Sequence, residues 1–326
     1  MIGDHKMKVV EEAKILGDHV NSKGNNSTLI EARVNSSKGV TTNMLAMCNE
    51  ATFGFYRIKV LLLLYRMVFV PTMLFNSEAW SHLTTNNISK LKTAQLRSLK
   101  RIMKTASSTP NAFVFLELGV LPVDYEIQKR QLVFLHHIVV LGDDDPVKEM
   151  YEQLKCYPDA ENWVTTIHKI LKKYDLPVKE KEIEIISKTT WKAMVKKAVL
   201  KVAWETLTTE CKSKKKTCNV KFTDTLEPQT YLEGYASDVA IMIFKLRGKS
   251  VNCLHNRGSD ALCRLCGAAK ETQEHAINCP KIAKGGLLLP LNDIYGIVPT
   301  NNMKVRQIVE RFNAFEEAVL EESETD

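Results

Sequence analysis

Three cysteines and one histidine near the end of the chain combine the residue types and the spacing of a zinc site. They read Cys263-x2-Cys266-x8-His275-x3-Cys279. Two cysteines separated by two residues can present both thiolates to one metal ion, and residues four apart share one face of a helical turn. Gly267, directly after the second cysteine, permits the turn that such a loop needs. Four such ligands suit tetrahedral Zn2+ and leave no open position for a catalytic water, so the spacing predicts a structural zinc.

Two other interpretations of these residues stay open. Without metal, they are three buried thiols and a surface histidine in a helical domain. A segment this short buries too little apolar surface to fold alone, which favours zinc. Cys253 and His255 form a nearby Cys-x-His pair, and one of them could exchange with a ligand of the cluster.

Two groups of basic residues are candidates for contacts with the phosphate backbone of RNA or DNA. The first lies on 86–104, an amphipathic helical pattern without acidic residues, and comprises Lys90, Arg97, Lys100, Arg101 and Lys104. The second comprises Lys196, Lys197 and Lys201, followed by the lysine-rich run 212–216. Residues 165–221 contain 15 lysines and arginines against 6 acidic residues. Such surfaces bind polyanions non-specifically and in a salt-sensitive way, although a solvated face has the same pattern.

No other pattern nominates an active site. The sequence has no phosphate-cradling glycine loop, no G-x-S-x-G and no H-E-x-x-H motif. His136 and His137 lie in an apolar helical pattern, which favours packed histidines over metal ligands. The aspartates 143–145 precede Pro146 and are expected to cap the next helix. We therefore expect no enzymatic activity and no small-molecule substrate.

Composition is that of a globular protein in a reducing compartment. Of 326 residues, 44% are hydrophobic and 25% charged, and the net charge of +7 permits a polyanionic partner. Eight cysteines are too sparse for a disulfide scaffold, and the polar start carries no secretory signal. The most apolar run, 60–75, contains Arg66 and Pro71 and falls short of a membrane span. We expect a nuclear or cytoplasmic protein that is not secreted and has no membrane partner.

A mostly helical chain must position these candidates. Helical periodicity begins near residue 27, and an apolar helix over 60–69 is expected to end or kink at Pro71. The first 26 residues allow a short β-hairpin around Gly17 and Gly24, built from Val9, Val10, Ile15, Leu16 and Val20.

Several segments resemble, in order, the reverse transcriptases of non-LTR retrotransposons. Residues 61–80 are similar to the thumb segment that ends in P-x-L-x-Y-x-x-E-x-W, with Asn76 where a tyrosine is usual. Residues 109–112 and 116–122 are similar to the TP and LE-x-G stretches of the family, and 130–137 to its arginine-rich helix.

The C-terminal segments continue this resemblance. Residues 231–232 and 244–247 resemble the segment before the knuckle of the family, and 263–279 resembles its cysteine–histidine motif. The resemblance extends over most of the chain. It implies a helical thumb, a helical linker and a zinc knuckle, parts that hold template RNA and target DNA in the family.

The catalytic residues of that family have no counterpart in this sequence. Residues 14–17 would correspond to the strand and turn that grip the primer, yet only 13 residues precede Lys14. No matching pair of aspartates occurs, and two-metal phosphoryl chemistry requires such carboxylates. Our hypothesis is a catalytically incomplete, reverse-transcriptase-derived protein that binds RNA or DNA backbone. The alternatives are a fragment of an active RNA-directed DNA polymerase and a host interaction scaffold with no nucleic-acid role.

The expected fold is mostly α, in five parts. These are a remnant of the palm and primer-grip hairpin (1–26), a thumb-like helical domain (27–142), a basic helical linker domain (143–256), a CCHC zinc knuckle (257–282) and a C-terminal helical tail (283–326).

Overall fold

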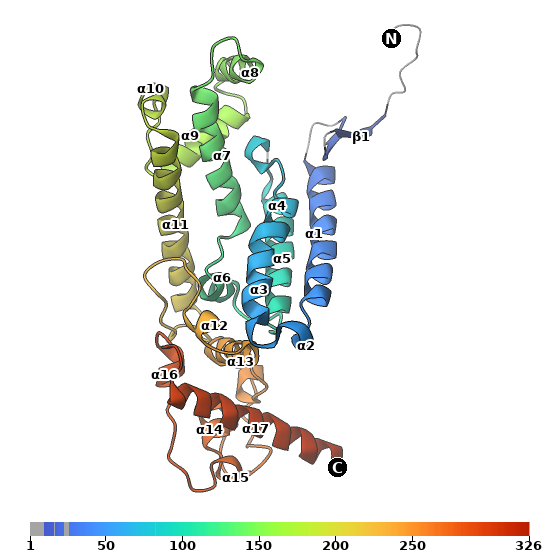
Figure 1. Cartoon of the computed structure of the whole chain (residues 1–326), viewed down its shortest axis with the longest axis vertical. Coiled ribbons are helices and arrows are strands. Elements are labelled where there is room, and N and C mark those ends of the chain that lie inside the picture. The colour runs from blue at the N-terminus through green and yellow to red at the C-terminus, as the bar shows by residue number, and fades with distance from the viewer. Residues whose placement is uncertain (1–9, 16, 23–25, 82, 326) are drawn as a thin grey trace. The chain divides into compact units, whose positions relative to one another are not determined.

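The protein is mostly helical, as predicted, with one small antiparallel sheet (Figure 1). The computed structural model describes residues 10–15, 17–22, 26–81 and 83–325, and of 323–325 only the backbone. Within these ranges no helix is both long and apolar enough to span a lipid bilayer.

The predicted hairpin near the N-terminus is confirmed. Strand β1 (Glu12–Ile15) pairs with β2 (Asp18–Asn21), with Glu12 opposite Asn21 and Ile15 opposite Asp18. Gly17 lies in the turn with φ of +94°, a conformation that side chains with a Cβ rarely adopt. Val9, Leu16 and Gly24, which the prediction also used, lie outside the described residues.

The chain forms two compact units. The first consists of Met1–Met44, Leu64–Gln95 and Leu121–Ala203, and the second of Leu45–Leu63, Leu96–Val120 and Trp204–Asp326. The five-part division expected from the sequence stays a prediction.

Helix α7 is the centre of the first unit. It contacts the short helices and turns around it, and its Arg130 and Gln131 side chains donate hydrogen bonds to the carbonyls of Leu74 and Trp80, both at 2.8 Å. The indole of Trp191 donates to the Leu132 carbonyl at 2.8 Å, and His136 stacks on the same indole. His136 is therefore a packed core residue. The helical elements that lie wholly or partly in this unit are α1 (Ser27–Met47), the π-helix η2 (Tyr65–Phe69), α4 (Val70–Met73), η3 (Ser77–Ala79), α5 (Thr85–Ile102), α7 (Val123–Val139), α8 (Pro146–Lys155), α9 (Trp163–Lys173), α10 (Glu180–Glu184) and α11 (Lys188–Ser213). The last residues of α1, α5 and α11 belong to the second unit.

Pro71 does not end its helix. The backbone stays helical through Met73, and the turn before the proline widens into the π-helix over Tyr65–Phe69. Proline lacks an N–H donor and crowds the preceding turn, which a wider turn relieves. The helix thus continues past Pro71 for two residues, with a local change of helix type before it; the expected kink stays a prediction.

A buried polar cluster organises the second unit. Glu117 and Arg247 form an ion pair at 2.8 Å with both side chains fully buried, and the Tyr231 hydroxyl donates to the same carboxylate. Arg247 also donates to the carbonyls of Lys221 and Ile294, at 2.8 and 2.6 Å. We call Glu117, Tyr231 and Arg247 the Glu117 cluster. The helices of this unit are α2 (Glu50–Phe53), η1 (Gly54–Tyr56), α3 (Arg57–Leu64), α6 (Asn111–Leu118), α12 (Tyr231–Gly234), α13 (Ser237–Arg247), η4 (His255–Arg257), α14 (Gln273–Asn278), α15 (Pro280–Ala283), α16 (Asn292–Tyr295) and α17 (Met303–Thr325).

Gly119 lets another segment approach the Glu117 cluster closely. It follows α6 with φ of +57°, and a Cβ at this position would lie 2.1 Å from the Pro228 backbone nitrogen. Any side chain here would displace residues 227–228, so the glycine is required by both its conformation and its contact.

Candidate metal centre

The four predicted zinc ligands come together at one point. The Sγ atoms of Cys263 and Cys279 lie 3.9 Å apart, and Cys266 Sγ lies 3.2 Å from His275 Nε2. All four ligand atoms lie within 4.8 Å of one another. Bond lengths of about 2.3 Å to sulfur and about 2.0 Å to nitrogen place tetrahedral zinc ligands roughly 3.5–3.8 Å apart. The cluster, which we call the metal centre, can therefore hold a metal ion and is compatible with zinc.

A tight loop presents the first two cysteines. The Gly267 N–H donates to the Cys263 carbonyl, and the Cys263 N–H to the Ala269 carbonyl, both at 2.8 Å. Gly267 has φ of +62°, which confirms that the turn after the second cysteine uses the conformational freedom of glycine. An isolated bridge between Leu262 and Lys270 closes the base of this loop.

Of the other two ligands, His275 lies within the short helix α14 and Cys279 directly follows it. The Thr272 side chain caps α14 by accepting a hydrogen bond from the His275 N–H at 3.1 Å. The helix ends at Asn278, and Cys279 follows in an extended conformation with ψ of 132°. The prediction that His275 and Cys279 share one helical face is thus wrong in detail, because the last ligand lies beyond the helix.

Burial and backbone hydrogen bonds act in opposite directions on the thiols. Burial raises the pKa of Cys263 and raises that of Cys279 to about 12. The backbone N–H of Ala268 lowers the pKa of the more accessible Cys266. Because a metal ion binds thiolates, filling this centre at neutral pH would release protons from the two buried cysteines.

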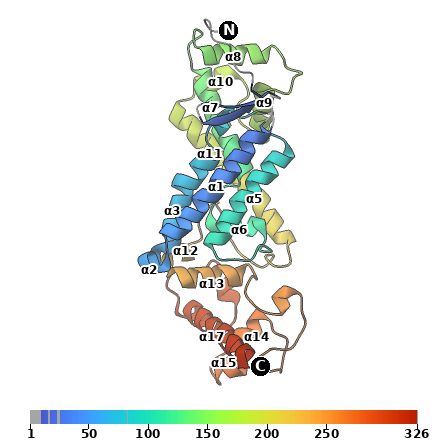
Figure 2. The same cartoon turned by 90° about the vertical axis from the view of Figure 1, so that its right-hand side faces the viewer.

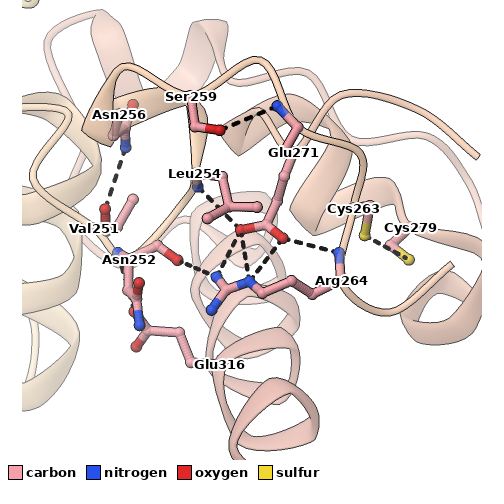
Figure 3. A network of polar contacts seen from close by, with 11 residues as sticks. Val251, Asn252, Leu254, Asn256, Ser259, Cys263, Arg264, Glu271, Cys279 and Glu316 are labelled. Atoms are coloured by element: carbon pink, nitrogen blue, oxygen red, sulfur yellow. Dashed lines mark hydrogen bonds and ion pairs between the residues drawn. The ribbon is translucent and has the colours of Figure 1, made fainter. Parts of the chain in front are cut away.

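A buried carboxylate fastens the loop between the two cysteines (Figure 3). Glu271 is fully buried and accepts hydrogen bonds from the backbone N–H groups of Leu254 and Arg264, both at 3.0 Å. The Arg264 guanidinium pairs with the same carboxylate at 2.6 Å and donates to the Asn252 carbonyl at 2.9 Å. Glu271 thus holds residues 252–254 against the metal-binding loop. Sequence reasoning did not single out this residue, since one acidic residue among polar neighbours gives no sign of burial.

The C-terminal helix supports the metal centre from outside the knuckle. Helix α17 packs against α14 and α15, which lie beside it in both views (Figure 1; Figure 2). Arg311 of α17 donates to the Leu287 carbonyl at 2.9 Å, and the Asn278 amide donates to the Leu289 carbonyl at 3.0 Å. The knuckle and the tail therefore share one packed core.

Cys253 and His255 do not join the four ligands. Cys253 is fully buried, while His255 Nδ1 lies 3.5 Å from an Asp260 carboxylate oxygen. Among the described residues, the metal centre is the cluster whose ligand atoms converge.

The first group of basic residues is less open than its sequence suggests. Lys90 pairs with Glu31 at 2.8 Å, and Lys104 pairs with Glu50. Helix α5 ends at Ile102, so Lys104 lies beyond the helix that was expected to carry it. Arg97 and Arg101 are both exposed.

Lys100 is engaged in structural hydrogen bonds. Its ammonium group donates to the carbonyls of Ser107 and Thr109, both at 2.7 Å, and to the Asn111 side chain at 2.9 Å. Burial lowers its pKa. These bonds fasten the loop after α5, which leaves Lys100 poorly placed to hold a phosphate.

The second group of basic residues is open. One face of α11 buries Trp191, Val195, Val199 and Ala203, and the lysines lie on the exposed remainder. Lys196, Lys197 and Lys201 are exposed, and no ion pair to them occurs in the part of the chain that the structure describes. Sequence reasoning missed two further exposed lysines, Lys188 and Lys192, although the absence of acidic residues over 185–204 could have indicated them. We call these five residues the α11 lysine face.

Comparison of the chain with protein-family models, with curated proteins and with solved structures found no match.

Proposed function

We propose that the metal centre binds one structural Zn2+ and that the protein binds the phosphate backbone of RNA or DNA. The zinc proposal is supported by the donor set, because three sulfur ligands and one imidazole suit zinc and fill its tetrahedral shell. All four positions are protein ligands. The ion would therefore stabilise the fold around α14 without acting on a substrate.

The α11 lysine face is the observation that carries the nucleic-acid proposal. Its five exposed lysines lie on one helix without an acidic residue between them. They spread over more than half of the helix circumference, and Lys196, Lys197 and Lys201 lie farthest from the buried stripe. A polyanion that contacts such a face releases counterions, so binding should be non-specific in sequence and should weaken steeply with salt.

The residues of α5 contribute unequally in this proposal. Arg97 and Arg101 are exposed and are expected to add contacts, although Arg101 also has a partner within the protein. Lys90 and Lys104 already have carboxylate partners, and Lys100 holds a loop. An ion pair at the surface is weak, so Lys90 and Lys104 could still exchange a carboxylate for a phosphate.

The resemblance to reverse transcriptases of non-LTR retrotransposons supports the same proposal. In that family, helical segments and a cysteine–histidine knuckle of this kind hold RNA and DNA. Two residues of the similar segments have structural duties: Glu117 accepts the Arg247 ion pair, and Gly119 permits the contact with Pro228. The proposal is one of binding and includes no chemical step.

Fluorescence anisotropy with labelled duplex DNA and structured RNA, repeated at several salt concentrations, tests the proposal. Replacing Lys196, Lys197 and Lys201 by alanine should weaken binding to every sequence and reduce the salt slope by about 3, roughly one for each phosphate that is no longer neutralised. The matched control replaces Lys172, Lys179 and Lys181, which are also exposed on the first unit. Equal weakening in both triple variants, or binding that does not depend on salt, would contradict the assignment.

A further inference from the structure

Among the described residues, a buried arginine in the second unit has no carboxylate bonded to it, although Lys104 and, more weakly, Arg57 lower the pKa of the nearby Glu50 carboxyl. Arg57 is only 7% exposed, and its Nε donates to the Cys48 carbonyl at 2.7 Å. Its Nη1 is buried and has no hydrogen-bond partner among the described residues. A buried charge and a buried unpaired donor both destabilise a fold unless something compensates them.

Arg57 lines a cavity of about 540 Å3. Two lysines line the same cavity, Lys104 from the segment after α5 and Lys245 from α13. Lys104 pairs with Glu50, which also lines the cavity, whereas no polar partner of the Lys245 ammonium occurs within the described ranges. The cavity therefore contains two cationic groups, on Arg57 and Lys245, that lack a carboxylate bonded to them.

The remaining polar groups of the cavity define what it can accept. The Ser237 hydroxyl donates to the Phe55 carbonyl and accepts from the Ile58 N–H, so its bonds are already made. Asp238 lines the cavity as an exposed carboxylate and would repel an anion. Glu50 is a second carboxylate of the lining, already paired with Lys104, and the Asn313 amide supplies a neutral donor. The open cationic donors of Arg57 and Lys245 favour a small oxyanion with several acceptor oxygens.

We propose that this cavity binds a phosphate group between Arg57 and Lys245, with Lys104 at its edge. Arg57 supplies one positive charge and the unpaired Nη1 donor, and the Lys245 ammonium group supplies a second positive charge with three donors. The phosphate could be free inorganic phosphate or a phosphomonoester at the end of a nucleic acid, and its chemistry is the same in both cases. The inference does not depend on backbone binding at the α11 lysine face.

Thermal unfolding of the zinc-loaded full chain in increasing inorganic phosphate, at constant ionic strength set with chloride, tests the site. Phosphate should raise the unfolding temperature in a saturable way, and calorimetry should give a stoichiometry of about one. Phosphate that stabilises no more than chloride does would overturn the proposal.

Two substitutions with opposite expected signs locate the site. Lys245→Ala should weaken phosphate binding by roughly tenfold, because it removes a charged donor. Asp238→Asn should tighten it, because it removes a repelling charge from the same cavity. Lys304→Ala removes an equal charge from the start of α17, outside the cavity, and should leave affinity unchanged. Equal weakening by the two lysine variants would show an adventitious ion only and would overturn the site. Arg57 itself also supports the Cys48 carbonyl, so its replacement is unsuited as the deciding variant.

Competition between probes identifies the source of the phosphate. A 5′-phosphorylated oligonucleotide that displaces inorganic phosphate, when its unphosphorylated form does not, would assign the cavity to a nucleic-acid end. If neither oligonucleotide displaces inorganic phosphate, the site belongs to the free ion. Displacement by both forms would overturn recognition of a phosphomonoester or free phosphate, since a diester backbone would then suffice.

Discussion

The metal centre and the Glu117 cluster belong to the same compact unit but are held by interactions of different range. The ligands Cys263 and Cys279 are 16 residues apart, whereas Glu117 and Arg247 are 130 residues apart. The metal centre surrounds a point where four ligand atoms converge, and the Glu117 cluster lies among fully buried aromatic side chains such as Phe113 and Phe244. Removal of the metal should therefore unfold only the segments around the metal centre. Loss of the long-range ion pair in the core should instead destabilise the whole unit.

Loss of a metal ligand should have the largest effect. Cys279→Ser should reduce bound zinc well below one ion per chain, because it removes a thiolate whose binding of the ion is coupled to folding of the knuckle. Atomic absorption on the purified protein measures this. Cys218→Ser, at an exposed cysteine, is the matched control.

The alternative in which Cys253 exchanges with a ligand of the metal centre predicts that a further variant loses zinc. If Cys253 served as a ligand, Cys253→Ser would also lose zinc. The observed cluster predicts that this variant retains its zinc, because Cys253 is not one of the converging ligands.

Breaking the ion pair of the Glu117 cluster should have the next largest effect, on the free energy of unfolding. Arg247→Met leaves the buried Glu117 carboxylate unpaired, which should reduce the free energy of unfolding by about 3–5 kcal/mol. Urea denaturation measures the loss, with the exposed Arg257→Met as control. Adding Glu117→Gln should recover part of it, since the uncompensated charge is then removed. A double variant as unstable as the single one would contradict this account.

Loss of the Glu271 charge beside the metal centre should have a smaller effect than loss of a metal ligand or of the ion pair in the Glu117 cluster. Glu271→Gln keeps the size of the side chain but loses its charge toward Arg264, so we expect a loss of about 1–3 kcal/mol around the knuckle. A lower affinity for zinc in a competition assay would report it. Glu274→Gln, on the exposed side of α14, should have no effect on zinc affinity.

The smallest expected effect distinguishes a basic residue of α5 with a structural role from one that binds nucleic acid. Lys100→Met should lower stability by about 1–2 kcal/mol, because its hydrogen bonds to Ser107, Thr109 and Asn111 can no longer form. Arg97→Met should leave stability nearly unchanged and weaken nucleic-acid binding instead. Denaturation and anisotropy on both variants would show whether the two roles are divided in this way.

The sequence predicts the local features of this protein well. The four metal ligands, the turn at Gly267 and the hairpin around Gly17 each depend on residues close in sequence, where spacing constrains geometry directly. Proline is a partial exception. Pro71 was expected to end or kink its helix, and the adjacent π-helix shows that a change in helical register can accommodate it.

Features that join distant segments could not be predicted in this way. Nothing in the neighbourhood of Glu117 indicates Arg247, and the acid-free run on α5 gives no sign that Glu31 and Glu50 approach Lys90 and Lys104. The hydrogen bonds of Lys100 could not be predicted either, because the carbonyls that accept them are placed by the path of the loop after α5. Charge patterns indicate candidates, and tertiary contacts decide which of them are open.

Hydrogen–deuterium exchange with and without chelator tests most directly the claim that the metal centre is a local structural element. After zinc removal, residues 252–283 and the facing side of α17 should lose protection, while α6 and α13 around the Glu117 cluster should keep theirs. Unchanged protection of residues 252–283, or an equal loss throughout α6 and α13, would contradict the account.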